Sequence, residues 1–118
     1  MKNKVLGIIG GGQLGRMTAL AAAKLGIECH VYDPDPNAPA FQVCFKSYIN
    51  DYEDLDAIKQ FAKKIDVALY EFENIPLKSA QIIEELCLLR PSSFVLSISQ
   101  DRLVEKNFLI NKAKVQTA

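Results

Sequence analysis

The sequence of 118 residues has no tryptophan, one histidine and three cysteines, and it has no long hydrophobic run. Its apolar runs are far shorter than the ~18 residues that a membrane-spanning helix needs, so we expect no membrane partner. The cysteines Cys29, Cys44 and Cys87 are odd in number and form no C-x-x-C pair. A disulfide framework is therefore not indicated, and we expect buried structural thiols in a cytoplasmic protein.

The chain also lacks an excess of charge of either sign, with 14 Lys and Arg residues against 14 Asp and Glu residues. A balanced charge offers no electrostatic footprint for nucleic acid, so we expect no such partner. The apolar fraction of 49% is ordinary for a globular protein. At this length we expect one domain with a proper core, which is small for a complete enzyme.

Glycine is present in only six positions, and three of these have a motif spacing. Gly10, Gly12 and Gly15 form G-x-G-x-x-G between a strand expected at residues 4–9 and a helix expected at residues 13–25. Glycine permits positive φ and a close approach of ligands, and the N–H groups of a helix N-terminus attract anions. The segment 10–15, here called the Gly loop, therefore predicts a phosphate or nucleotide site. A purely structural turn is the alternative.

Two charged residues fit an anionic ligand at this place. Asp33 lies 18 residues beyond Gly15 (33 minus 15), close to the spacing at which dinucleotide-binding domains place a ribose-binding acid. Arg16 falls in the first turn of the expected helix, where a cation opposes the helix dipole. That unfavourable position favours an anionic partner for Arg16.

The apolar spacing predicts alternating strands and helices along the chain. We expect further strands at residues 27–33, 47–49 and 66–72, and further helices at 52–64, 77–88, 93–99 and 101–112. Asp51 is the expected N-cap of the helix at 52–64, and Gly26 the C-terminal stop of the helix at 13–25. That helix is rich in alanine and suited to close packing on a sheet, and it carries one apolar stripe formed by Leu14, Met17, Ala21 and Leu25.

Alternating strands and helices with short connections predict an α/β fold with a doubly wound parallel sheet. Ligands of such sheets bind beyond the carboxyl ends of the strands. The Gly loop and the loops at residues 33–39 and 71–76 should therefore meet at one rim. Glu71 and Glu73 point to the same side of the chain, where a carboxylate can hold a ribose hydroxyl or an amine. Solvated loop acids are the alternative.

Four segments in the same order closely resemble those of the carboxyaminoimidazole ribonucleotide synthetases, a family of ATP-grasp ligases in purine synthesis. The segments are IGGGQLGRM at residues 9–17, DPDPNAPA at 33–40, YEFENIP at 70–76 and QDRLVEKNF at 100–108. The resemblance implies a Rossmann-like pre-ATP-grasp domain that does not bind a dinucleotide. It also implies a ligase that uses ATP to activate bicarbonate as carboxyphosphate and then carboxylates the amine of aminoimidazole ribonucleotide.

The resemblance, together with the rim argument, gives a set of expected site residues. The substrate phosphate is expected at Gly12, Gln13 and Leu14, and the aminoimidazole group at Glu73. Arg102 is expected to contact ATP, and no catalytic or metal-binding residue is expected in this chain. The whole substrate-binding set is Gly11, Gly12, Gln13, Leu14, Gly15, Arg16, Asp33, Glu73 and Asn74.

The same resemblance gives an expected domain division. Residues 1–100 are expected to form the substrate-side domain, and residues 101–118 to begin the connection to an ATP-grasp domain that binds ATP and Mg²⁺. We therefore expect the chain to be inactive alone and the full ligase to be a homodimer. Two segments depart from the family pattern, CFKS at residues 44–47 and VQTA at residues 115–118.

Three other functions fit parts of the sequence. Another ATP-grasp ligase, such as the formate-dependent glycinamide ribonucleotide transformylase, fits less well at residues 34–36 and 100–102. An NAD-binding domain of an oxidoreductase is suggested by the Gly loop and Asp33. A stand-alone nucleotide-sensing module is the third possibility, because a fold alone does not define a function.

Overall fold

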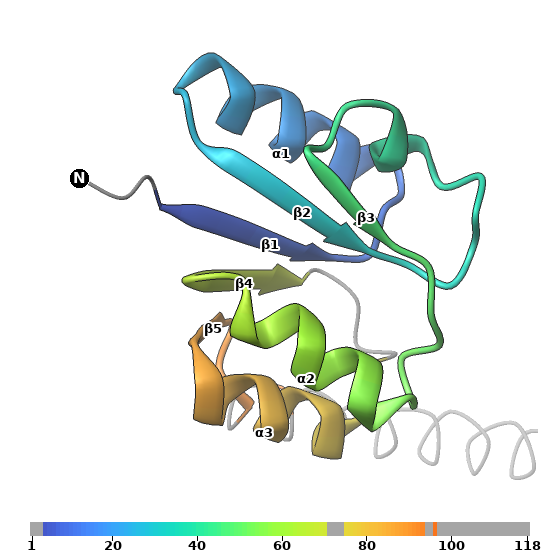
Figure 1. The fold of residues 1–118 in the computed structure, drawn as a ribbon, viewed down its shortest axis with the longest axis vertical. Helices are drawn as coiled ribbons and strands as arrows, with labels where there is room; N and C mark the ends of the chain where they lie inside the picture. Colours follow the sequence, from blue (N-terminus) through green and yellow to red (C-terminus); the bar gives the residue numbers. More distant parts are fainter. Residues whose placement is uncertain (1–3, 71–74, 94–95, 97–118) are drawn as a thin grey trace, which may run out of the picture.

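The computed structural model describes residues 4–70, 75–93 and 96 of the chain. This part forms an α/β domain in which strands and helices alternate (Figure 1). The strands are β1 (Val5–Ile9), β2 (Glu28–Tyr32), β3 (Lys46–Tyr48), β4 (Val67–Tyr70) and β5 (Leu88–Arg90). The helices are α1 (Gln13–Lys24), α2 (Leu55–Lys63) and α3 (Leu77–Leu86), and a short 3₁₀ helix spans Pro39–Gln42.

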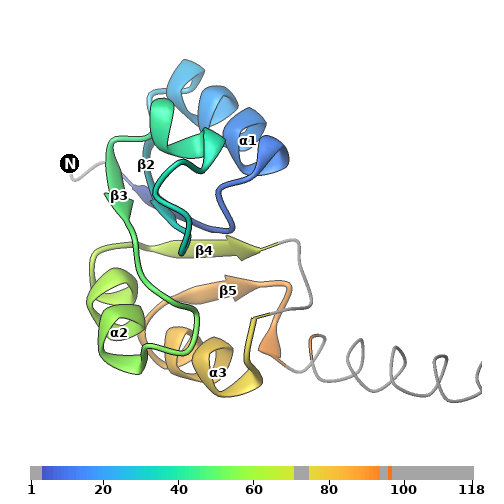
Figure 2. The ribbon, with the colours of Figure 1, turned by 90° about the vertical axis from the view of Figure 1, so that its right-hand side faces the viewer.

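The strands form one parallel sheet in the order β3-β2-β1-β4-β5. Helix α1 covers one face of this sheet, and α2 and α3 lie side by side on the other (Figure 2). The predicted doubly wound parallel sheet is therefore confirmed. The order reverses at β1, since the chain moves outward to β2 and β3 and then returns to β4 on the other side.

The two faces of the sheet have different cores. The face under α2 and α3 holds the large side chains, with Tyr32, Ile58 and Phe61 fully buried. The rings of Tyr32 and Phe61 meet edge-on, with centroids 5.4 Å apart. On the other face, α1 presents the small side chains of Ala19 and Ala22 to a cluster that includes Ile8 and Val31. The helix that follows the Gly loop therefore packs on the sheet through its smallest residues.

The apolar stripe on α1 does not face the sheet. Leu14, Met17 and Leu25 are 52%, 63% and 76% exposed, whereas Gly15, Ala19 and Ala22 are buried. The expected close packing of an alanine-rich helix is confirmed, but the side of α1 that packs on the sheet is the one with the smallest residues. Long side chains on that side would hold the helix away from the sheet, so they lie outside.

Several element boundaries differ from those expected. Asp54, not Asp51, is the N-cap of α2, and its carboxylate accepts a hydrogen bond from the Ala57 N–H at 3.1 Å. Residues 88–90, expected to end a helix and enter a loop, form β5, because Cys87 is extended and Leu89 faces the core. The stop at Gly26 is confirmed by its φ of 73°. Residues 71–72 and almost all of the helices expected at 93–99 and 101–112 lie outside the described part.

The three cysteines are free thiols. Cys29 is buried, whereas Cys44 and Cys87 are only partly buried, so the expected burial holds fully for one of them. Burial raises the pKa of Cys29 and of Cys87 to about 11. Thiols with such values are largely protonated at neutral pH and are weak nucleophiles.

A carboxylate on α3 gives a testable pH dependence. Glu84 accepts hydrogen bonds from the backbone N–H and the hydroxyl of Ser93, at 2.9 and 2.5 Å, and these bonds lower its pKa. A carboxylate whose pKa is lower in the folded than in the unfolded state stabilises the folded protein at pH values above the unfolded-state pKa. This stabilisation is lost as the pH falls through the folded-state pKa. We expect Glu84→Gln to lower the free energy of unfolding by up to about 0.5 kcal/mol at pH 7, a small value because the group is exposed.

The difference between Glu84→Gln and the parent chain should shrink toward zero near pH 3, measured by urea unfolding at both pH values. Glu85→Gln serves as the matched control, because Glu85 is an exposed neighbour on the same helix. A difference that grows on acidification would contradict the assignment.

Candidate substrate-binding rim

The carboxyl ends of β1, β2 and β4 lie at one edge of the sheet. Ile9 pairs with Tyr32 on one side and with Tyr70 on the other, so the residues that follow all leave the sheet together. Two of the three predicted loops, at 10–15 and 33–39, are thereby confirmed to share a rim. Of the third loop, Ile75 and Pro76 are described. The expected site residues Glu73, Asn74 and Arg102, and Glu71 beside them, lie outside the described residues.

Each glycine of the motif occupies its position for a different structural reason. Gly10 has a φ of 103°, which L-residues rarely adopt, and its N–H donates to the Tyr32 carbonyl at 2.9 Å. A Cβ on Gly15 would lie 2.4 Å from the Gly10 carbonyl oxygen. Gly12 has an ordinary φ of −70°, and apart from its two chain neighbours no described residue has an atom within 4 Å of where its Cβ would stand. Gly10 and Gly15 therefore build the turn, while Gly12 leaves open space in front of it.

The first turn of α1 opens into that space. Gly12 is the N-cap residue and has no side chain with which to cap the helix, and the first turn contains no acidic residue. The first bond of the helix joins the Arg16 N–H to the Gly12 carbonyl at 2.9 Å. The N–H groups of Gln13, Leu14 and Gly15 precede it and have no partner within the helix.

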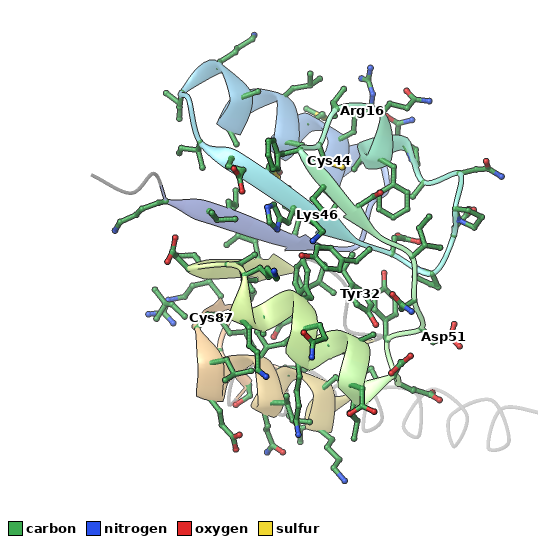
Figure 3. All side chains as sticks on the ribbon, viewed as in Figure 1. Arg16, Tyr32, Cys44, Lys46, Asp51 and Cys87 are labelled. Carbon is green, nitrogen blue, oxygen red and sulfur yellow. The ribbon has the colours of Figure 1, made fainter. Side chains whose placement is uncertain are left out.

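The side chains around this turn leave it accessible. Gln13 and Leu14 are exposed, Gly15 is buried and Arg16 is partly buried near the N-terminal end of α1 (Figure 3). N–H groups without a partner in the helix, the positive end of the helix dipole and a nearby guanidinium form an arrangement suited to a phosphate.

Asp33 holds the Gly loop from inside the protein. Its carboxylate accepts the Gly11 N–H at 2.7 Å with one oxygen and the Asp35 N–H at 2.8 Å with the other. The Tyr52 hydroxyl lies 3.5 Å from the first of these oxygens. Burial, with the charge of Asp33, raises the pKa of Tyr52 to about 12, so this hydroxyl stays a donor. The substrate-binding roles of Gly11 and Asp33 stay predictions, and the structure shows these two residues bonded to each other.

The segment after Asp33 is an ordered loop, as expected. The Asn37 N–H donates to the Asp35 carboxylate at 2.9 Å, and the Ala40 N–H donates to the Gly11 carbonyl at 2.8 Å. The loop is thus tied to the Gly loop by a backbone bond as well as by Asp33. Together these bonds fix the wall of the rim beside Gly11.

Residues after β3 also reach the rim, which the sequence reasoning missed. A hollow of about 250 Å³ is lined by Pro34, Asp51, Tyr52, Glu53 and Pro76. The Tyr32 hydroxyl donates to the Asp51 carbonyl at 2.5 Å, and Figure 3 shows the two residues on neighbouring segments. The signal was available, because Asp51 and Tyr52 follow a strand of the same parallel sheet and must leave it at the same edge.

The described part of the chain has neither a cluster of metal ligands nor a membrane-spanning helix. Residues 4–70 and 75–93 contain no group of three or more His, Cys, Asp or Glu residues placed to hold a metal ion. The single histidine, His30, bonds through Nε2 to the Glu28 carboxylate at 2.7 Å. Within the same residues no helix is long and apolar enough to cross a membrane.

Comparison with known proteins places this rim in a family. Residues 1–100 match the family described as ribonucleotide synthetase preATP-grasp domain. The chain belongs to this family. As a preATP-grasp domain, it has the Rossmann-like sheet that the four sequence segments predicted, and the resemblance stated from those segments is confirmed.

Three relatives of this preATP-grasp domain have closely similar enzyme names. The N5-carboxyaminoimidazole ribonucleotide synthase of Brucella melitensis is 45% identical over 113 residues, which are 96% of this chain and 31% of that protein. The N5-carboxyaminoimidazole synthetase of Staphylococcus aureus, solved with ADP, superposes with a TM-score of 0.80 at 37% identity, over 94% of this chain and 31% of that one. The carboxyaminoimidazole ribonucleotide synthase of Aspergillus clavatus, solved with ATP, has a TM-score of 0.77 at 28% identity, over 92% and 29%. The preATP-grasp domain thus spans about three tenths of the length of these relatives.

Proposed function

We propose that this chain is the substrate-binding part of an ATP-dependent ligase that carboxylates aminoimidazole ribonucleotide with bicarbonate. The observation that carries the proposal is the uncapped N-terminus of α1, which opens into free space at Gly12 in a domain of this family. A ribonucleotide phosphate fits such a place by charge and by hydrogen bonding. We infer the rest of the substrate, the aminoimidazole group, from the names of the relatives.

In this proposal the residues have distinct roles. The N–H groups of residues 12–15 hold the phosphate, and Arg16 adds a positive charge. Glu73 and Asn74, in the segment that follows β4, bind the aminoimidazole amine or a ribose hydroxyl. Arg102 contacts ATP at the start of residues 101–118, which lead toward an ATP-grasp domain.

The remaining chemistry is assigned to parts of the ligase outside this chain. ATP activates bicarbonate as carboxyphosphate, and the substrate amine then forms the new C–N bond with release of phosphate. The described residues offer no three-ligand group for a metal ion, so we assign Mg²⁺ to the ATP-grasp domain. We propose that the full ligase is a homodimer and that it is cytoplasmic, and the free thiols of this chain agree with the second point.

The family match favours this ligase over an NAD-binding role, because residues 1–100 match the ribonucleotide synthetase preATP-grasp domain. In a dinucleotide-binding domain the acid after the second strand accepts hydrogen bonds from a ribose. Here both oxygens of Asp33 already accept backbone N–H groups of the same rim. These two bonds give Asp33 a structural role in holding the Gly loop, whichever ligand the rim binds.

The proposal is tested by titrating the ¹⁵N-labelled chain with aminoimidazole ribonucleotide, ribose 5-phosphate and NAD. We expect both phosphate esters to shift the amide signals of residues 12–15, because phosphate oxygens there accept these N–H groups. NAD should leave those signals in place. The absence of shifts with both phosphate esters, or larger shifts with NAD, would overturn the proposal.

The role of Glu73 is tested in a ligase that carries this chain. Losing one partner of a charge-assisted hydrogen bond costs about 1.5–3 kcal/mol, or roughly a ten- to hundredfold loss of binding. We expect Glu73→Ala to raise the KM for aminoimidazole ribonucleotide by this factor and to leave the KM for ATP unchanged. Glu53→Ala is the control, because Glu53 is an exposed acid that lines the hollow of the same rim. Equal effects on both substrates would contradict the role.

A further inference from the structure

A chain of hydrogen bonds runs below the rim from the Gly loop to α3. The Gly11 N–H and the Tyr52 hydroxyl approach the same oxygen of Asp33, at 2.7 and 3.5 Å. At its other end, the backbone carbonyl of Tyr52 accepts a hydrogen bond of 2.6 Å from the hydroxyl of Ser79. Residues from four separate segments are thus joined through Tyr52.

The two ends of this chain have functional positions. Gly11 lies directly before the N-terminus of α1, where we place the phosphate. Ser79 lies in the first turn of α3, the helix that follows the loop at residues 71–76. Ser79 is fully buried, yet its hydroxyl bonds to a different segment. The contact therefore ties α3 to the segment after β3.

The side chain and the backbone of Tyr52 are both held in place by packing and hydrogen bonds. Its ring stacks on Tyr32, with centroids 6.0 Å apart and an angle of 27° between the planes. The Tyr32 hydroxyl in turn bonds to the carbonyl of Asp51, the residue before Tyr52. The backbone of residues 51–52 is therefore held from the sheet by Tyr32 and from α3 by Ser79.

We propose that Tyr52 is a positioning residue for the ligand of this rim. Through Asp33 it sets the Gly loop, and through Ser79 it sets the first turn of α3, so that these two segments keep the spacing that one ribonucleotide requires. Tyr52 does not touch the ligand in this proposal. The inference rests on the proposed function for the identity of the ligand, while the hydrogen-bonded chain is independent of it.

Tyr52→Phe removes only the hydroxyl that faces Asp33. Net contributions of single hydrogen bonds correspond to about a two- to tenfold change in an equilibrium. We expect the Gly11 amide of the ¹⁵N-labelled chain to exchange with solvent about two- to tenfold faster. In a ligase that carries the chain, the KM for aminoimidazole ribonucleotide should rise by a similar factor, with kcat and the KM for ATP unchanged.

Tyr48→Phe is the matched control. The Tyr48 hydroxyl also lies 3.5 Å from its partner, but this partner is His30 and not Asp33. We expect Tyr48→Phe to change neither the exchange of Gly11 nor the KM for the ribonucleotide. Equal effects of the two substitutions, or unchanged Gly11 exchange in Tyr52→Phe, would overturn the proposal.

Ser79→Ala tests the other end. It leaves the Tyr52 carbonyl without this donor, so we expect faster exchange at Gly11 here as well, although Ser79 lies in α3 and bonds to Tyr52, not to Asp33. Unchanged exchange at Gly11 would show that α3 is not part of the connection. If the parent protein fails to bind the ribonucleotide, the proposed function fails, while the Gly11 exchange still decides whether the connection exists.

Discussion

Gly12→Val is expected to weaken binding of aminoimidazole ribonucleotide by at least about a hundredfold. The space in front of the α1 N-terminus is open because Gly12 has no Cβ. A branched side chain there fills the volume that we assign to the phosphate and keeps its oxygens away from the N–H groups. Loss of two or more charge-assisted hydrogen bonds at about 1.5–3 kcal/mol each accounts for the size of the effect.

The fold should tolerate the same substitution. Gly12 has an extended conformation that valine adopts readily, and no described atom crowds its Cβ position. Valine is a poor N-cap, so a loss of up to about 1 kcal/mol of stability is expected. Calorimetric titration and urea unfolding measure the two effects separately. Unchanged phosphate-ester binding would show that the Gly loop is not the phosphate site.

Gly12→Ser is a control for which the expected change in stability has the opposite sign. A serine hydroxyl at the N-cap accepts a hydrogen bond from the first turn and is at least as good a cap as glycine. We therefore expect stability to stay equal or to rise by a few tenths of a kcal/mol, while ligand binding falls because the hydroxyl occupies one of the donors. A stable protein with weaker binding would separate the site from the fold.

Gly15→Val is expected to have the largest effect on stability, a loss of about 3 kcal/mol. Its Cβ would stand 2.4 Å from the Gly10 carbonyl oxygen, which is backbone and cannot rotate away. Gly10 itself is held by its positive φ and by its bond to Tyr32. Relief therefore requires that α1 move away from the sheet, and such overpacking costs about 1–3 kcal/mol or more.

Urea unfolding of Gly15→Val measures the loss. Gly12→Ala is the matched control, because it adds a methyl group to the same loop without a clash. Helix propensity alone would favour a larger residue at position 15, since glycine is about 1 kcal/mol worse than alanine inside a helix. A gain in stability in Gly15→Val would therefore mean that the contact with Gly10 does not limit the packing.

The sequence was sufficient to predict those secondary-structure elements that have strong local sequence patterns. The strand, glycine turn and helix at residues 4–25 and the parallel character of the sheet follow from periodicity and from the short connections. The orientation of α1 did not follow, because Leu14 and Met17 look like a core stripe on hydrophobicity alone. Whether large or small residues face a sheet depends on the distance of approach, which is a property of the tertiary structure.

The candidate site was predictable as a location but not as a set of contacts. Parallel topology placed the Gly loop and Asp33 at one rim, as the structure confirms. It could not show that Asp33 bonds to Gly11, because that bond depends on the exact path of the loop at 33–39. The weak signal for β5 is similar, since three residues with one buried leucine carry too little periodicity to be separated from a helix end.

The contact between α1 and the sheet has a consequence for ligand binding. The helix is fixed by Gly15, Ala19 and Ala22, none of which has a side chain with rotatable bonds. Such residues lose no side-chain conformational entropy when they are packed, so this contact forms without that cost and does not depend on a ligand. The donors of the first turn are thereby preorganised, and an anion that binds there need not spend affinity on ordering them.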